Sequence, residues 1–335
     1  MSATSIGTRP SRAVATTRAQ LVTMVSRSGV LVALLALLLF GGLRYDNFLS
    51  AYNILEMLRN NSMFMLVALG MTFVIMTGGI DLSVGSVAAL SSVVAAMASP
   101  YGMAAGVAAG VGTGAVAGLL NGFVIARLKV LPFIATLVTM LAARGTALLL
   151  AHNQSVSVSY DTDFTHLGQG DILGVPAPAW IGGIAFLIGS FTLNFTGFGR
   201  HTLAVGGGED ASRLMGLPVE RVKLIVYLIS GALAGLAGVI LASNYGAGQP
   251  TEGAGWELFA IASVVVGGTL LTGGVGSVMA SLTGVLLLSL IFNILNFENG
   301  LGVISLSAYW QSVIRGLFLL VVVMLQSRMA MRRNP

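Results

Sequence analysis

The residues that could carry enzymatic chemistry are few in this chain, and their spacing excludes the common reaction types. A phosphate-binding loop for ATP needs Gly-Lys-Ser or Gly-Lys-Thr, but the two lysines, Lys129 and Lys223, follow Leu128 and Val222. The three histidines are scattered, without a His-Glu-x-x-His pair. The absence of cysteine excludes disulfides, thiolate metal sites and cysteine nucleophiles. The sequence therefore predicts a chain that is not an enzyme and that itself binds neither a metal nor a cofactor.

Asp81 is the most informative acidic residue, because it lies between two long apolar runs in TGGIDLSVGS (77–86). An ionised carboxylate in mid-bilayer costs about 2.5–3.5 kcal/mol on insertion scales, so a carboxylate near a span is a candidate functional residue. Gly78 and Gly79, just before it, can break a helix. Two compatible interpretations are open. Asp81, helped by Ser83, caps the following helix, or it belongs to the gate of a transport pathway.

Three asparagines, Asn121, Asn293 and Asn296, lie on otherwise apolar helix faces. Their amides can hydrogen-bond the hydroxyl groups of a sugar, or they can join neighbouring helices inside the membrane. Together with the turn at 77–86 they form a set of candidate gate and pathway residues. That set is Gly78, Gly79, Asp81, Ser83, Asn121, Asn293 and Asn296.

The composition shows which elements must position these residues. The chain has 335 residues, of which 56% are hydrophobic and only 9% charged, and its mean hydropathy is +0.90. Soluble domains carry about 25% charged residues, whereas a membrane span needs roughly 20 apolar residues. We therefore expect an all-α, polytopic integral membrane protein with about ten transmembrane helices. The basic residues lie at span ends, so the high isoelectric point does not indicate nucleic-acid binding.

The apolar runs divide the chain into one transmembrane unit between two basic termini. A tail at 1–28 precedes a single transmembrane domain at 29–328, and a short basic end follows at 329–335. A short interfacial helix is expected at 53–59. The predicted spans are 29–43, 62–77, 84–99, 102–126, 131–151, 177–197, 223–243, 258–272, 276–296 and 308–326.

Glycine recurs every fourth residue through the span at 102–126, from Gly102 to Gly122. Residues four apart share one helix face, so this face is almost bare and another helix can approach its backbone. Static packing and a sliding surface for gating are both open interpretations. A second pattern is an internal echo, because TGGIDLSVGS (77–86) and TGGVGS (272–277) both place Gly-Gly before a Gly-Ser pair between two spans.

The distribution of basic residues predicts the orientation in the membrane. With ten spans and a cytoplasmic N-terminus, thirteen of the seventeen Lys and Arg residues fall in inside segments, as the positive-inside rule requires. Both termini and the stretch 199–223 are then cytoplasmic, and the acidic loop 152–176 is outside.

The stretch 199–223, which we call the charged island, holds seven charged residues between apolar runs. A short helix from Glu209 to Met215 is expected within it. Two acids suit its positive end, Gly216 can supply a left-handed cap, and Pro218 blocks continuation. Because so short a helix is unstable alone in water, it needs a surface to dock on. A docking helix for a soluble partner and an ordinary solvated loop are both open from the residues alone.

Several segments resemble the ribose-type permeases of bacterial ABC importers, the binding-protein-dependent sugar and branched-chain amino-acid permease family. The similarity keeps its order and spacing over about residues 50–325. The matching segments are GMTFVIMTGGIDLSVGSVAAL (70–90), NGFVIARLKVLPFIATLVTMLAARG (121–145), LGVPAPAWI (173–181), FGRHTLAVGGGEDASRLMGLPVERVKLIVY (198–227), QPTEGAGWELFAIASVVVGGTLLTGGVGSV (249–278) and SAYWQSVIRGLFLL (307–320).

This resemblance implies an ABC-importer permease fold in the bacterial inner membrane. It also implies the partners: a second permease subunit, identical or paralogous, ABC ATP-binding subunits that hold ATP and Mg, and a periplasmic sugar-binding protein. The implied function is import of a monosaccharide by alternating access, driven by ATP hydrolysed on the partner subunits. An ion-coupled secondary sugar transporter, with Asp81 and Arg144 as a relay, is the alternative.

The resemblance also implies that the charged island carries the family's ATPase-coupling segment, with the pattern Gly-Asn-Glu-x-Ala-x-x-x-Gly-Ile. This chain departs from the pattern at Gly208, where the family has Asn, and at Leu217, where it has Ile. Gly is nearly as good as Asn before a helix, so little consequence is expected. Glu209, Asp210 and Arg213 are the expected contacts. The whole segment is Gly208, Glu209, Asp210, Ala211, Ser212, Arg213, Leu214, Met215 and Gly216.

Overall fold

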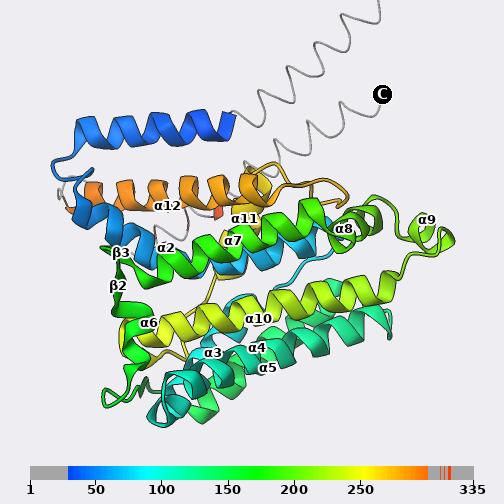
Figure 1. Ribbon diagram of the computed structural model, residues 1–335, viewed down its shortest axis with the longest axis horizontal. Coiled ribbons are helices and arrows are strands. Elements are labelled where there is room, and N and C mark those ends of the chain that lie inside the picture. Colours follow the sequence, from blue (N-terminus) through cyan, green and yellow to red (C-terminus); the bar gives the residue numbers. More distant parts are fainter. Residues whose placement is uncertain (1–28, 301–309, 311–312, 314–315, 318–335) are drawn as a thin grey trace, which may run out of the picture.

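The computed structural model describes residues 29–300 together with residues 310, 313, 316 and 317, and these form a bundle of helices (Figure 1). The helix Gly29–Arg44 comes first. The longer helices that follow are α2 (Ala51–Met76), α3 (Val84–Ala98), α4 (Met103–Ala126), α5 (Pro132–Leu150), α7 (Ala177–Phe195), α10 (Val219–Tyr245) and α12 (Val278–Gly300). Shorter ones are η1 (Ser99–Tyr101), η2 (Asp163–Thr165), α6 (His166–Gln169), α8 (Gly197–Gly207), α9 (Glu209–Leu214) and α11 (Trp256–Val266).

Within the described residues, seven helices are long and apolar enough to cross a membrane, and Gly29–Arg44 and α11 are shorter apolar helices. The prediction of an all-helical, polytopic membrane protein is therefore confirmed. Two antiparallel pairs of two-residue strands occur in loops: β1 (Val156–Ser157) with β4 (Ala247–Gly248), and β2 (Asp171–Ile172) with β3 (Val175–Pro176). The two basic termini, 1–28 and 329–335, lie outside the described residues. So does the predicted span 308–326, apart from residues 310, 313, 316 and 317.

Two predicted elements were wrong. The interfacial helix expected at 53–59 is continuous with the next span, because Ser50 caps α2 through its hydroxyl and the stretch 51–69 contains neither glycine nor proline. The eighth span, expected at 258–272, is the eleven-residue helix α11, which at 1.5 Å per residue is too short to cross a bilayer. Much of the charged island is helical, since α8 and α9 fill it and α10 begins at Val219.

The segment 246–255 explains why α11 is short. It leaves α10 at the end of the bundle that holds β2 and β3, and Gln249 bonds Ser92 in the interior of α3. Gly253 then lies against Gly85 so closely that a Cβ on either residue would collide with the other's backbone. Trp256 begins α11 beside Phe64, near the middle of α2, with ring centroids 4.9 Å apart. Non-helical backbone at this depth is tolerated because protein surrounds it.

Helix α10 forms the centre of the bundle, with α4 packed closely along it. A Cβ at Gly118 would collide with the carbonyl oxygen of Tyr227, and one at Gly114 with that of Gly231. Backbone therefore touches backbone along the glycine face of α4. This contact supports the packing interpretation of the four-residue repeat, because small residues let membrane helices associate closely.

The bundle has two ends that carry different structures. The α9 end holds the turn 77–83, the charged island and the turn 272–277, and the opposite end holds α6, β2 and β3 (Figure 1). Helix α2 runs between them, since Arg59 in its first half bonds Asp171 of β2, while the backbone oxygen of Met76 at its other end accepts a bond from Gly274.

Candidate functional site

Asp81 lies buried inside the bundle, 1% exposed, and all of its recorded bonds go to serines. Its Oδ1 accepts from the backbone N–H of Ser83 at 3.0 Å and from the hydroxyl of Ser83 at 2.6 Å. Its Oδ2 accepts from the hydroxyl of Ser230 in α10 at 2.8 Å. The bond to the backbone of Ser83, directly before α3, resembles a helix cap. Asp81 therefore joins the turn 77–83 both to the start of α3 and to α10.

The buried network continues from Ser83 into two further helices. Asn121 of α4 donates to the Ser83 hydroxyl at 3.0 Å and accepts from Thr139 of α5 at 2.5 Å. Asn121 is 2% exposed. Each of these polar groups has a partner, as buried groups require. Three of the seven predicted gate and pathway residues, Asp81, Ser83 and Asn121, thus share one cluster. Asn121 connects α4 to the start of α3 and to α5, which agrees with the interpretation that it joins neighbouring helices.

Gly78 and Gly79 lie in the same turn but face the α9 end. Gly78 has φ +77°, which ends α2 as a left-handed residue can. Both glycines line a cavity of about 270 Å³ together with Lys129, Glu209 and Lys223. The structure therefore places part of the predicted gate and part of the predicted coupling segment around one cavity.

The two echoed turns also meet each other and the charged island. Gly274 donates its N–H to the carbonyl oxygen of Met76 at 3.0 Å, and Gly273 lies against the backbone of Gly78. A Cβ on Gly206, in α8, would collide with the same Met76 oxygen. We call this meeting of 76–79, 206–207 and 272–274 the glycine junction. It connects α8 directly to the end of α2 and to the turn 272–274.

The predicted short helix in the charged island is confirmed as α9, over Glu209–Leu214. Gly216 follows it with φ +78°, and Leu217 donates to the carbonyl of Ser212 at 3.0 Å, which closes the helix as expected for a left-handed glycine cap. Gly208 precedes it with φ 174° and no side-chain cap, an extended conformation that asparagine could also adopt. The departure from the family pattern at this position leaves α9 intact.

The charged residues of α9 bond one another and the neighbouring helix. Arg213 bonds Glu209 at 2.9 Å and also Glu220 at the start of α10. Glu209 accepts in addition from Lys223, and Glu220 from Lys129 at 3.2 Å. Burial raises the pKa of Glu209, but the hydrogen bonds from Lys223 and Arg213 outweigh it and hold that pKa below its ordinary value. Glu209 and Arg213 therefore fix α9 to α10.

The tip of α9 is apolar and faces outward. Leu214 is 91% exposed and Met215 is 69% exposed, whereas Ser212 is buried. Asp210 and Ala211 are exposed beside them. Sequence reasoning included Leu214 and Met215 in the segment but favoured the charged residues as contacts. The signal was present, since two adjacent large apolar residues precede the Gly-Leu-Pro that ends the helix.

Asn293 and Asn296 lie far from Asp81, in a cavity of about 620 Å³ between the first half of α2 and the second half of α12. We call it the amide chamber. Asn293 donates to Asn53 at 3.0 Å, and Asn53 donates to Asn293 at 3.2 Å. The other lining residues are Glu56, Met57, Asn60, Asn61, Ser289, Phe292 and Phe297. Sequence reasoning did not predict the α2 side of this chamber.

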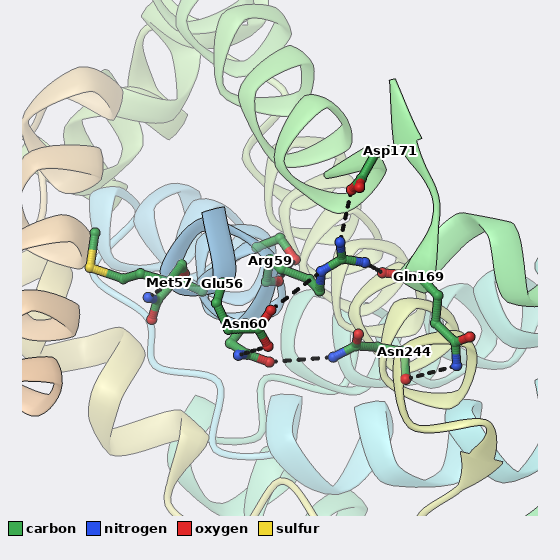
Figure 2. Close-up of polar contacts among 10 residues, drawn as sticks. Glu56, Met57, Arg59, Asn60, Gln169, Asp171 and Asn244 are labelled. Atoms are coloured by element: carbon green, nitrogen blue, oxygen red, sulfur yellow. Dashed lines mark hydrogen bonds and ion pairs between the residues drawn. The ribbon is translucent and has the colours of Figure 1, made fainter. Parts of the chain in front are cut away.

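The same α2 segment is also fixed to the loop 152–176, through Arg59, and to α10, through Asn60. In Figure 2, Arg59 reaches Asp171 of β2, and Asn60 lies beside Asn244 of α10. Arg59 donates to Asp171 at 2.8 Å and to the carbonyl of Gly168 at 2.9 Å. These bonds give the first turns of α2 a fixed position, so the side chains that line the amide chamber are held in place.

Arg144, which lies in the span predicted at 131–151, holds the segment 246–255. It donates to the carbonyl oxygens of Pro250 and Glu252 at 2.7 and 2.6 Å. Among the described residues it makes no recorded bond to Asp81. The pair considered as an ion relay is thus divided between two separate clusters.

Comparison with known proteins places the chain in a family. The family described as the permease component of the branched-chain amino acid transport system matches residues 53–323. The chain is 39% identical over 303 residues to the ribose import permease protein RbsC of Escherichia coli K12, covering 89% of this chain and 92% of that protein. It is 40% identical over 308 residues to RbsC of Bacillus subtilis 168, covering 91% and 94%.

A third relative is the L-arabinose transport system permease protein AraH of Escherichia coli K12, 40% identical over 301 residues and covering 88% of each chain. No solved structure matches the chain. The family match covers most of the sequence and includes the turn 77–83, the charged island and both sides of the amide chamber. This multi-pass membrane protein therefore belongs to the permease-component family of the branched-chain amino acid transport system, as a transport subunit and not an ATPase.

Proposed function

We infer that this chain is the membrane-spanning subunit of an ATP-driven importer of a monosaccharide in the bacterial inner membrane. The similar permeases are named for ribose and L-arabinose, so pentoses are the first candidates. The chain carries no Gly-Lys-Ser or Gly-Lys-Thr loop, so ATP and Mg would be held by partner ATP-binding subunits. A second permease subunit and a periplasmic sugar-binding protein complete the proposed complex.

The observation that carries this proposal is the outward apolar tip of α9 on a base of internal ion pairs. A side chain as exposed as Leu214 contributes little to folding, and adjacent exposed apolar residues often mark an interaction site. We propose that Leu214 and Met215 enter a groove of the ATP-binding subunit. The α9 end of the bundle then faces the cytoplasm, with both chain termini, and the β2–β3 end faces the periplasm.

The glycine junction supplies a route from that docking surface to the transport path. Movement of α9 displaces α8, and α8 lies against the end of α2 and the turn 272–274 through Gly206. Protein interiors are close-packed, so such contacts transmit displacement. Asp81 and the turn 77–83 follow directly after the displaced end of α2. We propose that closure of the ATP-binding subunits shifts this turn, and that alternating access follows from the rigid-body motion.

The test is transport by the reconstituted complex. The chain, its ATP-binding subunits and the sugar-binding protein are placed in vesicles, and uptake of radiolabelled D-ribose and L-arabinose is measured with and without ATP. ATP-dependent uptake of one of these sugars is expected. Accumulation by the chain alone, driven by a proton or sodium gradient, would instead establish the ion-coupled alternative.

A further inference from the structure

We propose that the amide chamber between α2 and α12 is a binding site for a neutral, polyhydroxylated solute, through which a sugar passes on its way into the bundle. This proposal rests on the proposed function and names a site for the transported sugar in this subunit. The site lies in the half of the bundle next to β2 and β3, away from Asp81 and the charged island.

Two matched stripes of side chains build the chamber. On α2 the lining residues are Asn53, Glu56, Met57, Asn60 and Asn61, and on α12 they are Ser289, Phe292, Asn293, Asn296 and Phe297. Each set follows the spacing i, i+3, i+4, i+7 and i+8, which places all five residues on one helix face. The lining faces of α2 and α12 therefore have the same residue spacing, and they lie on either side of a cavity of about 620 Å³.

The chemistry of the lining suits a sugar better than an ion. Each amide offers both donors and an acceptor, as the hydroxyl groups of a sugar do. Phe292 and Phe297 add apolar surface for the C–H faces of such a solute. Among the described residues of the lining, Glu56 is the single charged one, and it already accepts a bond from Asn60 at 2.9 Å. A volume of this size is within the usual range for small-molecule sites.

Ser289 provides an independent observation. The residue lines the chamber, it is 3% exposed, and its buried hydroxyl has no hydrogen-bond partner within the described part of the chain. Buried polar groups normally have partners. Ser289 lies at the midpoint of α12, which puts this hydroxyl at the inner end of the chamber. A solute hydroxyl there would supply the missing partner.

The reciprocal amide pair of Asn53 and Asn293 crosses the chamber between its two walls. These two bonds are neutral and use groups that a pair of sugar hydroxyls can replace one for one. A solute moving from the periplasmic face toward Ser289 would exchange its hydroxyls for these bonds. The pair then opens without leaving an unsatisfied amide.

The test uses the absence of cysteine from the chain. Ser289→Cys is nearly isosteric, and Ser91→Cys is its control, because Ser91 is also buried and unpartnered within the described residues but does not line this chamber. Each variant is assembled with its ATP-binding subunits in vesicles and exposed to trimethylammonium-ethyl methanethiosulfonate, a membrane-impermeant reagent. Modification of this chain is measured by mass spectrometry, with D-ribose, L-arabinose or betaine present.

We expect Ser289→Cys to be modified and Ser91→Cys to be spared. The transported sugar should slow the modification about tenfold, as occupancy of a site at ten times its dissociation constant requires, and betaine should not. If the unsubstituted complex imports sugar while Ser289→Cys resists the reagent, or is modified at the same rate with every sugar, the chamber is not a sugar site. An oxidative disulfide between two copies at this position would also overturn the proposal, because it would show that a second copy fills the space.

A second variant checks the result without a thiol. Asn293→Leu is expected to lower the kcat/KM of transport about tenfold, the loss of one hydrogen bond to the solute. Asn194→Leu is the control, because its amide bonds Ser190 within its own helix, α7. An unchanged kcat/KM in Asn293→Leu would contradict the proposal. Failure of the unsubstituted complex to import any sugar would contradict the proposed function itself.

Discussion

Arg213 donates to the carboxylate of Glu209 one helical turn earlier in α9, at 2.9 Å. The same guanidinium bonds Glu220 at the start of α10, and Lys223 bonds the other carboxylate oxygen of Glu209. Four of the seven charged residues of the charged island, Glu209, Arg213, Glu220 and Lys223, are therefore paired within the chain. They hold α9 in one orientation, with its apolar tip directed outward.

Reversing one charge should disrupt α9 and its coupling to the ATP-binding subunits. Arg213→Glu places a third carboxylate between Glu209 and Glu220, so two attractions become two repulsions. We expect sugar-dependent ATP hydrolysis by the complex to fall about tenfold or more, and the second change Glu209→Lys to restore part of it, as for residues in contact. Insertion should be unaffected. If the double variant is no better than Arg213→Glu alone, Arg213 contacts the partner instead.

The tip of α9 should contribute docking energy and little folding energy. Leu214→Asp is expected to weaken co-purification of the ATP-binding subunit, with a loss of about 2 kcal/mol as for an apolar side chain buried at an interface. Leu173→Asp is the control, since Leu173 is also 91% exposed but lies in the loop between β2 and β3. Equal losses in the two variants would argue against a specific docking role for Leu214.

The junction between α8 and the end of α2 allows a comparison of two adjacent glycines. A Cβ on Gly206 would collide with the backbone of Met76, whereas one on Gly207 meets nothing within 4 Å. We expect Gly206→Ala to lower stability by about 1–3 kcal/mol, the usual cost of overpacking, and to reduce coupled transport. Gly207→Ala should match the unsubstituted chain in the thermal unfolding midpoint. If Gly206→Ala changes neither stability nor coupled transport, the backbone at the glycine junction can move to accommodate a Cβ.

Substitutions of Asp81 can separate the effect of its charge from the effect of its hydrogen bonds. In Asp81→Asn the amide oxygen can still accept from Ser83, and the amide nitrogen can donate to the Ser230 hydroxyl. We therefore expect Asp81→Asn to stay within about 1 kcal/mol of the parent stability, while Asp81→Leu loses about 1–3 kcal/mol because Ser83 and Ser230 lose a partner. Thermal unfolding gives the stability. A transport defect in Asp81→Asn beyond its stability loss would show that the charge itself is used.

Local signals predicted α9 and the glycine face of α4 because each depends on nearby residues. The acids, Gly216 and Pro218 determine where α9 begins and ends, and the four-residue repeat of α4 alone indicates close packing. Helix α11 was mispredicted because its apolar run continues past Val266. Its length depends instead on the segment 246–255, which Ser92 and Gly85 hold deep in the bundle.

A different physical reason explains why the amide chamber could not be predicted from the sequence. The spacing of Asn53, Met57, Asn60 and Asn61 is visible in the sequence, and so is that of Ser289, Asn293 and Asn296. Which polar face of one helix turns toward which face of another is a property of tertiary packing. The internal pairing of Glu209 with Lys223, fourteen positions apart, was missed in the same way.

The contact between Gly206 and the Met76 carbonyl has a consequence for the timing of transport. Side chains change rotamer within nanoseconds, so a side-chain contact can absorb a small displacement before it reaches the next helix. At this contact a backbone oxygen lies where a side chain would be, and no rotamer is available to absorb the motion. The shift of α8 and the shift of the turn before Asp81 should then share one relaxation time, in the microsecond-to-millisecond range of rigid-body motions.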